Sequence, residues 1–199
     1  MTVAIVHLGA GNTASVQFAL ERLGADTRIT SDPVEIAEAE RLVLPGVGAA
    51  GYAMERMAAL GLTDVIKAFE RPLLGLCLGQ QLLFAESEEN GGAAMLGFIS
   101  GTVRRMPVRH DLPVPHMGWS QLHKLKDDPL LQGVSEGDYA YFVHSYVCPD
   151  TGATIACADY GAEVPAMVRA GNRWGCQFHP ERSAGAGARI LKNFLEVAA

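Results

Sequence analysis

The stretch from Arg71 to Phe84 constrains the fold of this chain more than any other. Its apolar residues 73–76 predict a short buried strand that runs straight into a helix. Cys77 lies at the junction, with Gly75 and Gly79 two residues to either side. Such a turn strains the backbone of its central residue and leaves no room for side chains two residues away, so glycine fits both places. The pattern is that of a nucleophile elbow, with sulfur in place of the serine oxygen.

An elbow would lift the Cys77 sulfur above the sheet and place it at a helix N-terminus. The helix dipole favours the thiolate there, and the thiolate is the reactive form of cysteine. A buried structural cysteine at a tight turn would give the same isolated pattern. A reactive Cys77 therefore requires further groups elsewhere in the chain.

Composition limits the class of protein. The 199 residues are 49% hydrophobic and 19% charged, values typical of a globular protein with a large core. The net charge of −6 argues against a nucleic-acid-binding surface. No apolar run approaches the ~20 residues that cross a bilayer. No secretory signal is evident and the cysteine spacings are irregular, so we expect a cytoplasmic protein with reduced thiols.

Strand and helix patterns alternate along the first ninety or so residues. The predicted strands cover residues 3–8, 26–29, 41–44 and 73–76. Helical patterns between them have Val16, Phe18, Ala19, Leu20 and Leu23 on the first apolar face, begin again at Pro33, and continue over 52–60 and 62–69. This alternation predicts an α/β fold with a doubly wound, mostly parallel sheet and flanking helices. Active sites of such sheets lie beyond the carboxyl ends of the strands, where Asn12, Gly46-Val47-Gly48 and Cys77 fall.

The second half of the sequence contains mainly short strand patterns. Short strand candidates separated by turns cover residues 101–106, 119–125, 139–147, 154–158, 166–170 and 174–178. Several are close enough to pair antiparallel, so we expect an antiparallel extension of the sheet. A final helix begins near Gly187 and buries Ile190, Leu191, Phe194 and Leu195. Without repeats or linkers, residues 1–199 are expected to form a single domain.

A cysteine nucleophile needs a base, and the base needs an orienting group. His179 follows the predicted strand 174–178, and Glu181 lies two residues further on. If Pro180 keeps this segment extended, both side chains face the same way and the carboxylate can hold one imidazole nitrogen. The alternative is a loop histidine beside a solvated glutamate.

Backbone donors for an oxyanion are the third requirement. Gly46-Val47-Gly48 at the tip of the neighbouring strand can turn N–H groups toward Cys77, and the N–H of Leu78 is a second donor. A glycine-rich turn before a helix is also common where it only connects a strand to a helix.

Two other kinds of site compete with this interpretation. Gly9-x-Gly11-x-x-Ala14, with Asp32 about twenty residues on, fits a dinucleotide-binding fingerprint. Cys176-x-x-His179, with His116 or His144, has metal-ligand spacing but lacks a second close pair. Cys148 and Cys157 fit small core residues better than ligands. We expect neither a metal nor a cofactor.

Two motifs together resemble a known family. Residues 75–81 (Gly-Leu-Cys-Leu-Gly-Gln-Gln) and 179–181 (His-Pro-Glu) are similar to motifs of the class I (triad) glutamine amidotransferases. Residues 9–12, 115–119 and 141–146 further resemble the amidotransferase subunits of imidazole glycerol phosphate synthases. Departures from that pattern are His7-Leu8, Ser120 and Arg182.

The resemblance implies a role for each matching residue. Cys77 would be the nucleophile, His179 the base and then the acid, and Glu181 the orienting group. Positions matching the glutamine site are Gln81, Glu89, His144, Ser145 and Tyr146. Positions matching the partner surface are Asn12, Trp119 and Arg182.

The implied activity is hydrolysis of L-glutamine through a Cys77 thioester. The ammonia would pass to a (β/α)₈ cyclase subunit that makes imidazole glycerol phosphate and aminoimidazole carboxamide ribotide in histidine biosynthesis. Alternatives are an amidotransferase subunit of an anthranilate or carbamoyl phosphate synthase, a stand-alone γ-glutamyl hydrolase, or a binding module whose thiol takes no part. Neither nucleic acid nor a membrane is an expected partner.

Overall fold

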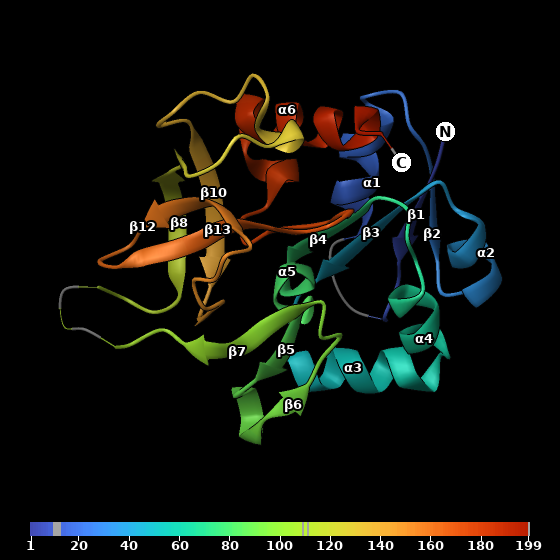
Figure 1. Cartoon of the computed structure of the whole chain (residues 1–199), viewed down its shortest axis with the longest axis horizontal. Helices are drawn as coiled ribbons and strands as arrows, with labels where there is room; N and C mark the ends of the chain where they lie inside the picture. The colour runs from blue at the N-terminus through green and yellow to red at the C-terminus, as the bar shows by residue number, and fades with distance from the viewer. Residues whose placement is uncertain (10–12, 109, 111, 199) are drawn as a thin grey trace.

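The fold, seen in a computed structural model that defines residues 1–9, 13–108, 110 and 112–198, is built on one large sheet (Figure 1). The strands identified in these residues follow the order β2 (Asp26–Thr30), β1 (Thr2–Val6), β3 (Arg41–Gly46), β4 (Leu73–Cys77), β14 (Arg173–Cys176), β13 (Glu163–Ala170), β12 (Thr154–Asp159) and β9 (His123–Lys124). Neighbours from β2 to β14 pair in parallel. Neighbours from β14 to β9 pair antiparallel.

Helices cover both faces of this sheet. One face carries α1 (Thr13–Glu21) and α6 (Ala184–Glu196); the other carries α2 (Pro33–Glu38), α3 (Ala50–Ala59) and α4 (Leu62–Lys67). Side chains of β1 alternate between the layers: Val3 and Ile5 join the core under α1 and α6, and Ala4 joins the core under α3 and α4. Burial on both faces explains the continuous apolar runs of these strands. The predicted doubly wound, mostly parallel sheet with an antiparallel extension is confirmed.

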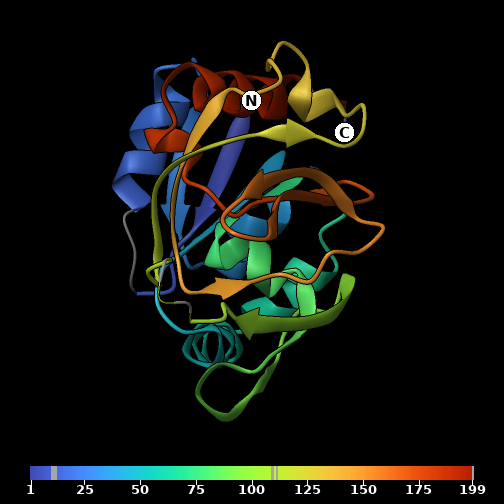
Figure 2. The same ribbon diagram turned by 90° about the vertical axis from the view of Figure 1, so that its left-hand side faces the viewer.

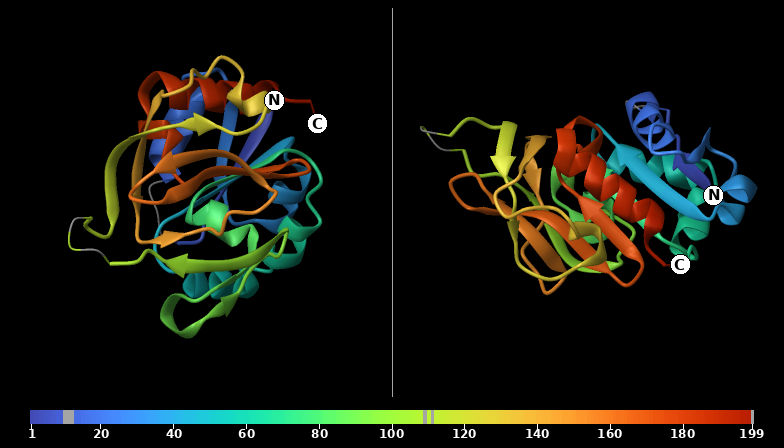
Figure 3. Two further views of the ribbon diagram at one scale, coloured as in Figure 1. Left: turned by 60° about the vertical axis from the view of Figure 1, so that its left-hand side comes forward. Right: turned by 90° about the horizontal axis from the view of Figure 1, so that it is seen from above.

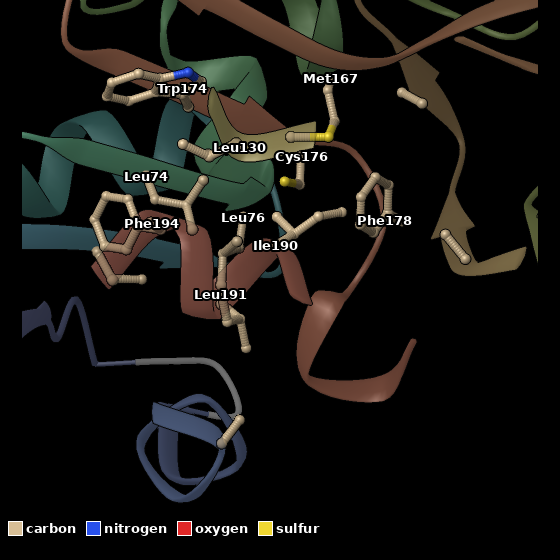
Figure 4. Packing of buried hydrophobic residues seen from close by; sticks show 14 of the residues in the cluster. Leu74, Leu76, Leu130, Met167, Trp174, Cys176, Phe178, Ile190, Leu191 and Phe194 are labelled. Atoms are coloured by element: carbon tan, nitrogen blue, oxygen red, sulfur yellow. The ribbon is translucent and has the colours of Figure 1, made fainter. Parts of the chain in front are cut away.

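The core between the sheet and α6 is dense with large side chains (Figure 4). Leu74 and Leu76 of β4 meet Ile190, Leu191 and Phe194 of α6. All five are at most 1% exposed. The predicted C-terminal stripe is therefore confirmed, and its helix begins three residues before the expected start.

Two smaller sheets complete the described part of the fold, and Figure 2 and the left view of Figure 3 show them from the side of the antiparallel extension. One is the antiparallel pair of β8 (His116–Gln121) and β10 (Tyr139–His144). The other has the order β11 (Tyr146–Val147), β7 (Ile99–Arg105), β5 (Phe84–Ser87) and β6 (Ala93–Ala94). Short 3₁₀ turns are η1 (Glu89–Gly91), η2 (Pro129–Leu131) and η3 (Pro180–Arg182).

The antiparallel region is more finely divided than predicted. The predicted strand 119–125 is two strands, β8 and β9, because the chain changes partner at the fully buried Leu122 and His123 then pairs with β12. The predicted strand 139–147 is interrupted at Ser145, whose carbonyl accepts the N–H of Met106. The sequence did not predict β5 or β6, since residues 84–87 follow a helical pattern directly.

One residue of the first helix was assigned to the wrong face. Phe18 is 57% exposed, whereas Val16, Ala19 and Leu20 are buried. Buried positions of a helix recur three or four residues apart, and Phe18 falls between them. No helix in the described ranges is long and apolar enough to cross a membrane.

Candidate active site

Cys77 lies at a strained strand-to-helix turn. It ends β4, precedes the short helix α5 (Leu78–Leu82), and has φ 53° and ψ −105°. A Cβ on Gly75 would lie 2.4 Å from the Gly79 carbonyl oxygen, and a Cβ on Gly79 would lie 1.8 Å from the Leu44 oxygen. Only glycine permits these approaches. The elbow geometry predicted for this stretch is confirmed.

Beside the elbow is a cavity of about 380 Å³. Its lining comes from six parts of the chain and consists of Val47, Gly48, Cys77, Leu78, Gln81, Glu89, Pro115, Val143, His144, Ser145, Tyr146 and His179. The structure thus brings the candidate nucleophile, the candidate base and all five candidate glutamine-site residues together. Gly46 does not line the cavity; it pairs with Cys77 in the sheet, and a Cβ there would lie 2.8 Å from Leu78 Cβ.

The side chains of His179 and Glu181 form a buried pair. His179 Nδ1 lies 2.9 Å from Glu181 Oε1, with side chains 12% and 3% exposed. The predicted contact is present, but the extended segment expected to produce it is wrong. Residues 180–182 form the 3₁₀ turn η3, which Pro180 can begin because its missing N–H is not needed in a first turn. The turn brings the carboxylate back toward the imidazole.

Ser183, which the sequence did not single out, fixes this turn in place. Its hydroxyl donates to the His179 carbonyl at 2.7 Å and accepts the Tyr141 N–H at 2.9 Å. The His179 N–H donates to the Tyr141 carbonyl at 2.9 Å. These bonds attach the turn to β10, so the position of His179 depends on a strand about forty residues away.

The pKa of His179 is strongly raised. Burial acts to lower the pKa of His179, but its interactions with Cys77 and Glu181 outweigh burial and raise that pKa to about 10. Its Nε2 is buried and has no hydrogen-bond partner among the described groups. Because His179 lines the same cavity as Cys77, this nitrogen is available for a proton exchanged with a reacting group.

The other thiols differ from Cys77 in their surroundings. Burial raises the pKa of the Cys148 thiol to about 12 and that of Cys157 to about 11, and it also raises the pKa of Cys176. All three lie in the core. Among the described residues, no group of three or more His, Cys, Asp and Glu side chains is arranged to hold a metal ion.

Two buried amides link the cavity to the sulfur. Gln81 Nε2 donates to the Tyr146 carbonyl and to Gln177 Oε1, both at 3.1 Å. Gln177 Nε2 in turn lies 3.7 Å from Cys77 Sγ. Gln177 was not predicted from the sequence, where its one signal was its place two residues before His179.

Glu89 connects the cavity to the glycine-rich turn. Its carboxylate accepts the Ala50 N–H at 2.8 Å, at the start of α3, which has no cap from its own N-cap side chain. Gly48, two residues before, has φ +99°, a conformation that side chains rarely adopt. Glu89 therefore anchors the end of the segment that carries Val47 and Gly48.

The candidate partner residues are less completely defined. Trp119 is 51% exposed on β8, and Arg182 is exposed on η3, next to Glu181. Asn12 lies outside the described residues, as do residues 10 and 11, so three positions of the dinucleotide-like fingerprint are not described. Asp32 of that fingerprint caps α2, accepting the Val34 N–H at 2.8 Å.

Comparisons with known proteins identify the family. The family model for glutamine amidotransferase class-I matches residues 4–198. The chain is 49% identical to imidazole glycerol phosphate synthase subunit HisH of Xanthomonas axonopodis pv. citri (strain 306), over 98% of this chain and 97% of that protein. The same subunit of Xylella fastidiosa (strain Temecula1 / ATCC 700964) is also 49% identical, with the same coverage.

Solved structures support the fold. A glutamine amidotransferase matches with a TM-score of 0.75 and 21% identity, over 98% of this chain and 97% of that one. The glutaminase domain of the Trypanosoma brucei protein CTPS matches with a TM-score of 0.69 and 15% identity, over 100% and 95%. These two matches show the fold, whereas the family model and the two HisH relatives at 49% identity establish the family. The chain belongs to the class I glutamine amidotransferases and, within them, to the family of imidazole glycerol phosphate synthase subunit HisH.

Proposed function

We propose that this protein is the glutaminase subunit of an imidazole glycerol phosphate synthase and hydrolyses L-glutamine through a thioester on Cys77. The observation that carries the proposal is the shared cavity: Cys77 at a strained elbow and His179, paired with Glu181, line the same space of about 380 Å³. Membership of the HisH family supports a role in histidine biosynthesis rather than in another synthase.

The reaction begins with attack of the Cys77 thiolate on the side-chain amide carbon of glutamine. His179 holds the proton, and Glu181 stabilises the resulting imidazolium. Backbone N–H groups of Leu78 and of the 46–48 turn are the donors for the tetrahedral oxyanion. His179 then gives its proton to the departing nitrogen, the C–N bond breaks, and ammonia leaves a γ-glutamyl thioester.

Hydrolysis of the thioester completes the cycle. His179, now neutral, accepts a proton from water as the water oxygen attacks the thioester carbon. The C–S bond breaks, glutamate leaves, and the proton on His179 again pairs with the Cys77 thiolate. One glutamine and one water thus give one glutamate and one ammonia.

The remaining cavity residues hold the amino-acid end of glutamine in this proposal. Glu89 supplies a carboxylate for the substrate ammonium, and Gln81 and residues 144–146 line the same cavity. Because Glu89 already accepts the Ala50 N–H, binding of an ammonium there places the substrate next to the segment that carries the oxyanion donors.

The partner is a cyclase subunit with a (β/α)₈ barrel that receives the ammonia. Free ammonia would be protonated in bulk water, so direct transfer needs a shared surface. Exposed apolar side chains on β8 and β10 support such a surface: Met117 is 62% exposed, Trp119 51% and Tyr139 54%. Arg182 is a further candidate for this contact, and so, from the sequence alone, is Asn12. We assign the complex to the cytoplasm.

The deciding experiment compares wild type with Cys77→Ala in complex with the cyclase. We expect Cys77→Ala to lose glutamine-dependent turnover of the cyclase's nucleotide substrate, because only the sulfur carries the covalent step. Turnover with added ammonium salts should persist and increase with pH as free ammonia increases. Glutamine-dependent turnover near wild type in Cys77→Ala would disprove the mechanism.

Partner dependence needs a separate measurement. Glutamine hydrolysis is expected to be low in the isolated protein and to rise with cyclase plus a nucleotide analogue, since repositioning one oxyanion donor changes the rate by ~10²- to 10³-fold. Trp119→Ala should weaken only the stimulated rate. Leu125→Ala, which removes an apolar side chain 49% exposed elsewhere, is the matched control. Full activity in the isolated protein, unchanged by partner or ligand, would contradict this part.

A further inference from the structure

A chain of hydrogen bonds runs across the β8–β10 pair. His116 and His144 are opposite each other in this pair. His116 Nδ1 lies 3.1 Å from His144 Nε2, His116 Nε2 lies 2.9 Å from Ser120 Oγ, and His144 Nδ1 lies 2.9 Å from the Tyr146 carbonyl oxygen. Both nitrogens of each ring are therefore used.

The direction of these bonds follows from the groups at the end of the chain. The Tyr146 carbonyl can only accept, so His144 carries its proton on Nδ1. In a neutral His144, Nε2 is then an acceptor, and His116 must donate from Nδ1. His116 Nε2 becomes an acceptor in turn, and the Ser120 hydroxyl supplies the proton for that bond. All donors point from Ser120 toward Tyr146.

The surroundings keep both rings neutral and fixed. Burial lowers the pKa of His116 to about 4, and burial lowers that of His144 to about 4 as well. His116 is stacked between Tyr160 and Phe142, with ring centroids 3.9 and 4.7 Å away. Gly118, between His116 and Ser120 in the strand, has φ +140°, a backbone conformation that favours glycine.

The chain of hydrogen bonds ends inside the cavity. The Tyr146 carbonyl that accepts from His144 also accepts from Gln81, and Gln81 continues through Gln177 to within 3.7 Å of the Cys77 sulfur. His144, Tyr146 and Gln81 all line the cavity. His116 and Ser120 do not, so they touch the site only through His144.

We propose that His116 and Ser120 are positioning residues, which orient His144 and the Tyr146 carbonyl and thereby hold Gln81 in place against the substrate. This rests on the proposed function only in identifying the cavity as the glutamine site. Removing the Ser120 hydroxyl leaves His116 Nε2 buried without a donor, and the whole chain can then lose its direction.

Nuclear magnetic resonance tests the chain without any turnover. Long-range ¹⁵N–¹H correlations distinguish the two tautomers of each ring, and both His116 and His144 are expected as the neutral Nδ1–H form. In Ser120→Ala, the side-chain amide signals of Gln81 should shift, whereas Ser120→Thr should leave them near wild type. An Nε2–H tautomer of His116, or an unchanged Gln81 signal in Ser120→Ala, would overturn the proposal.

Kinetics of the complex with the cyclase provide the functional readout. Ser120→Ala is expected to raise KM for glutamine about ten-fold with little change in kcat, because a buried acceptor loses its partner and the binding side of the cavity loosens. Ser120→Thr should restore KM. Ser135→Ala, which removes an exposed hydroxyl after η2, is the matched control. Ammonia-dependent turnover should be unchanged in all variants.

The outcomes separate the two proposals. Absence of glutamine turnover in the wild-type complex would reject the proposed function, while the tautomers and the Gln81 signals still decide whether the chain positions the cavity. A wild-type KM in Ser120→Ala, or a KM raised equally in Ser120→Thr, would reject the positioning role alone.

Discussion

The two sides of the cavity are held by different means. On the nucleophile side, Cys77 is fixed by backbone meeting backbone: Gly75 and Gly79 allow α5 to approach β3 and β4 more closely than any side chain would permit. On the base side, His179 is fixed by hydrogen bonds that it donates to Glu181 and to a backbone carbonyl of β10, and by one that it accepts from Ser183. The first side is set by local sequence and the second by residues brought together through folding.

This difference predicts different consequences of mutation. A change at the elbow moves the backbone, so it should affect stability and activity together. A change on the base side removes one hydrogen bond at a time, so it should affect activity with smaller loss of stability. The following experiments test that distinction, from the largest expected effect to the smallest.

The largest effect on rate is expected on the base side. His179→Ala removes the group placed to move the proton and should abolish glutamine turnover. Glu181→Gln keeps a contact with the imidazole but no longer stabilises its cation, so we expect a milder loss of ~10²- to 10⁴-fold in kcat. Steady-state glutaminase assays of the complex measure both. Equal and small losses would indicate that the pair is not catalytic.

At the elbow, Gly79→Ala is expected to lower stability and activity together. Its Cβ would meet the Leu44 carbonyl oxygen at 1.8 Å, so α5 must move and carry Cys77 with it. We expect a loss of about 3 kcal/mol or more in the free energy of unfolding, and at least ~10²-fold in rate. Urea denaturation and glutaminase assays check this.

The control for that variant is Gly185→Ala. A Cβ on Gly185 meets nothing within 4 Å, and the residue lies in the first turn of α6. We expect it to leave activity unchanged and to stabilise the protein by about 0.5 kcal/mol. If Gly79→Ala behaved in the same way, the close approach would not be what fixes Cys77.

A smaller effect concerns the pH dependence of stability. His179 has its pKa raised from the usual value of 6.5 to about 10, so its protonated form stabilises the fold fully below pH 6.5. That contribution should decline as pH rises toward about 10. Unfolding free energies at pH 6, 8 and 10 should therefore fall less steeply for Glu181→Gln than for wild type. A midpoint near 6.5 for His179 in an NMR titration would contradict the predicted shift.

The smallest effect is expected from relieving strain at Cys77. Cys77→Ala keeps a Cβ atom on a residue with the positive φ of 53°, so the strain remains. Cys77→Gly has no Cβ atom and relieves that strain. Both should be inactive toward glutamine. We expect Cys77→Gly to be more stable than Cys77→Ala by about 1 kcal/mol, the reverse of the usual order of alanine and glycine. Urea denaturation of the two variants measures the difference in their free energies of unfolding.

These differences also explain which parts could be predicted from the sequence. The elbow was predictable because glycine at 75 and 79 is a steric requirement within five residues of chain. The contact between His179 and Glu181 was predicted, but through an extended segment, since nothing local distinguishes that from the 3₁₀ turn η3. Gln177 and Ser183 were missed because each has a partner far away in the sequence, Gln81 for the first and Tyr141 for the second.

The details of the antiparallel half could not be predicted for the same reason. The strands of residues 116–147 change partners at Leu122 and Ser145, and those changes depend on neighbouring strands rather than on local pattern. His116 or His144 was considered as a further ligand beside the Cys176-x-x-His179 spacing, yet the two histidines bond to each other at 3.1 Å. Asn12 remains a prediction, because it lies outside the described residues.

The backbone conformation of Cys77 has an evolutionary consequence. Because φ is positive there, glycine is the residue that the fold alone would favour, and one base change converts a cysteine codon into a glycine codon. Selection for a stable protein would therefore replace the cysteine, and only selection for its chemistry opposes that replacement. A gene copy released from the requirement for glutamine hydrolysis is expected to lose this residue early, while its fold persists.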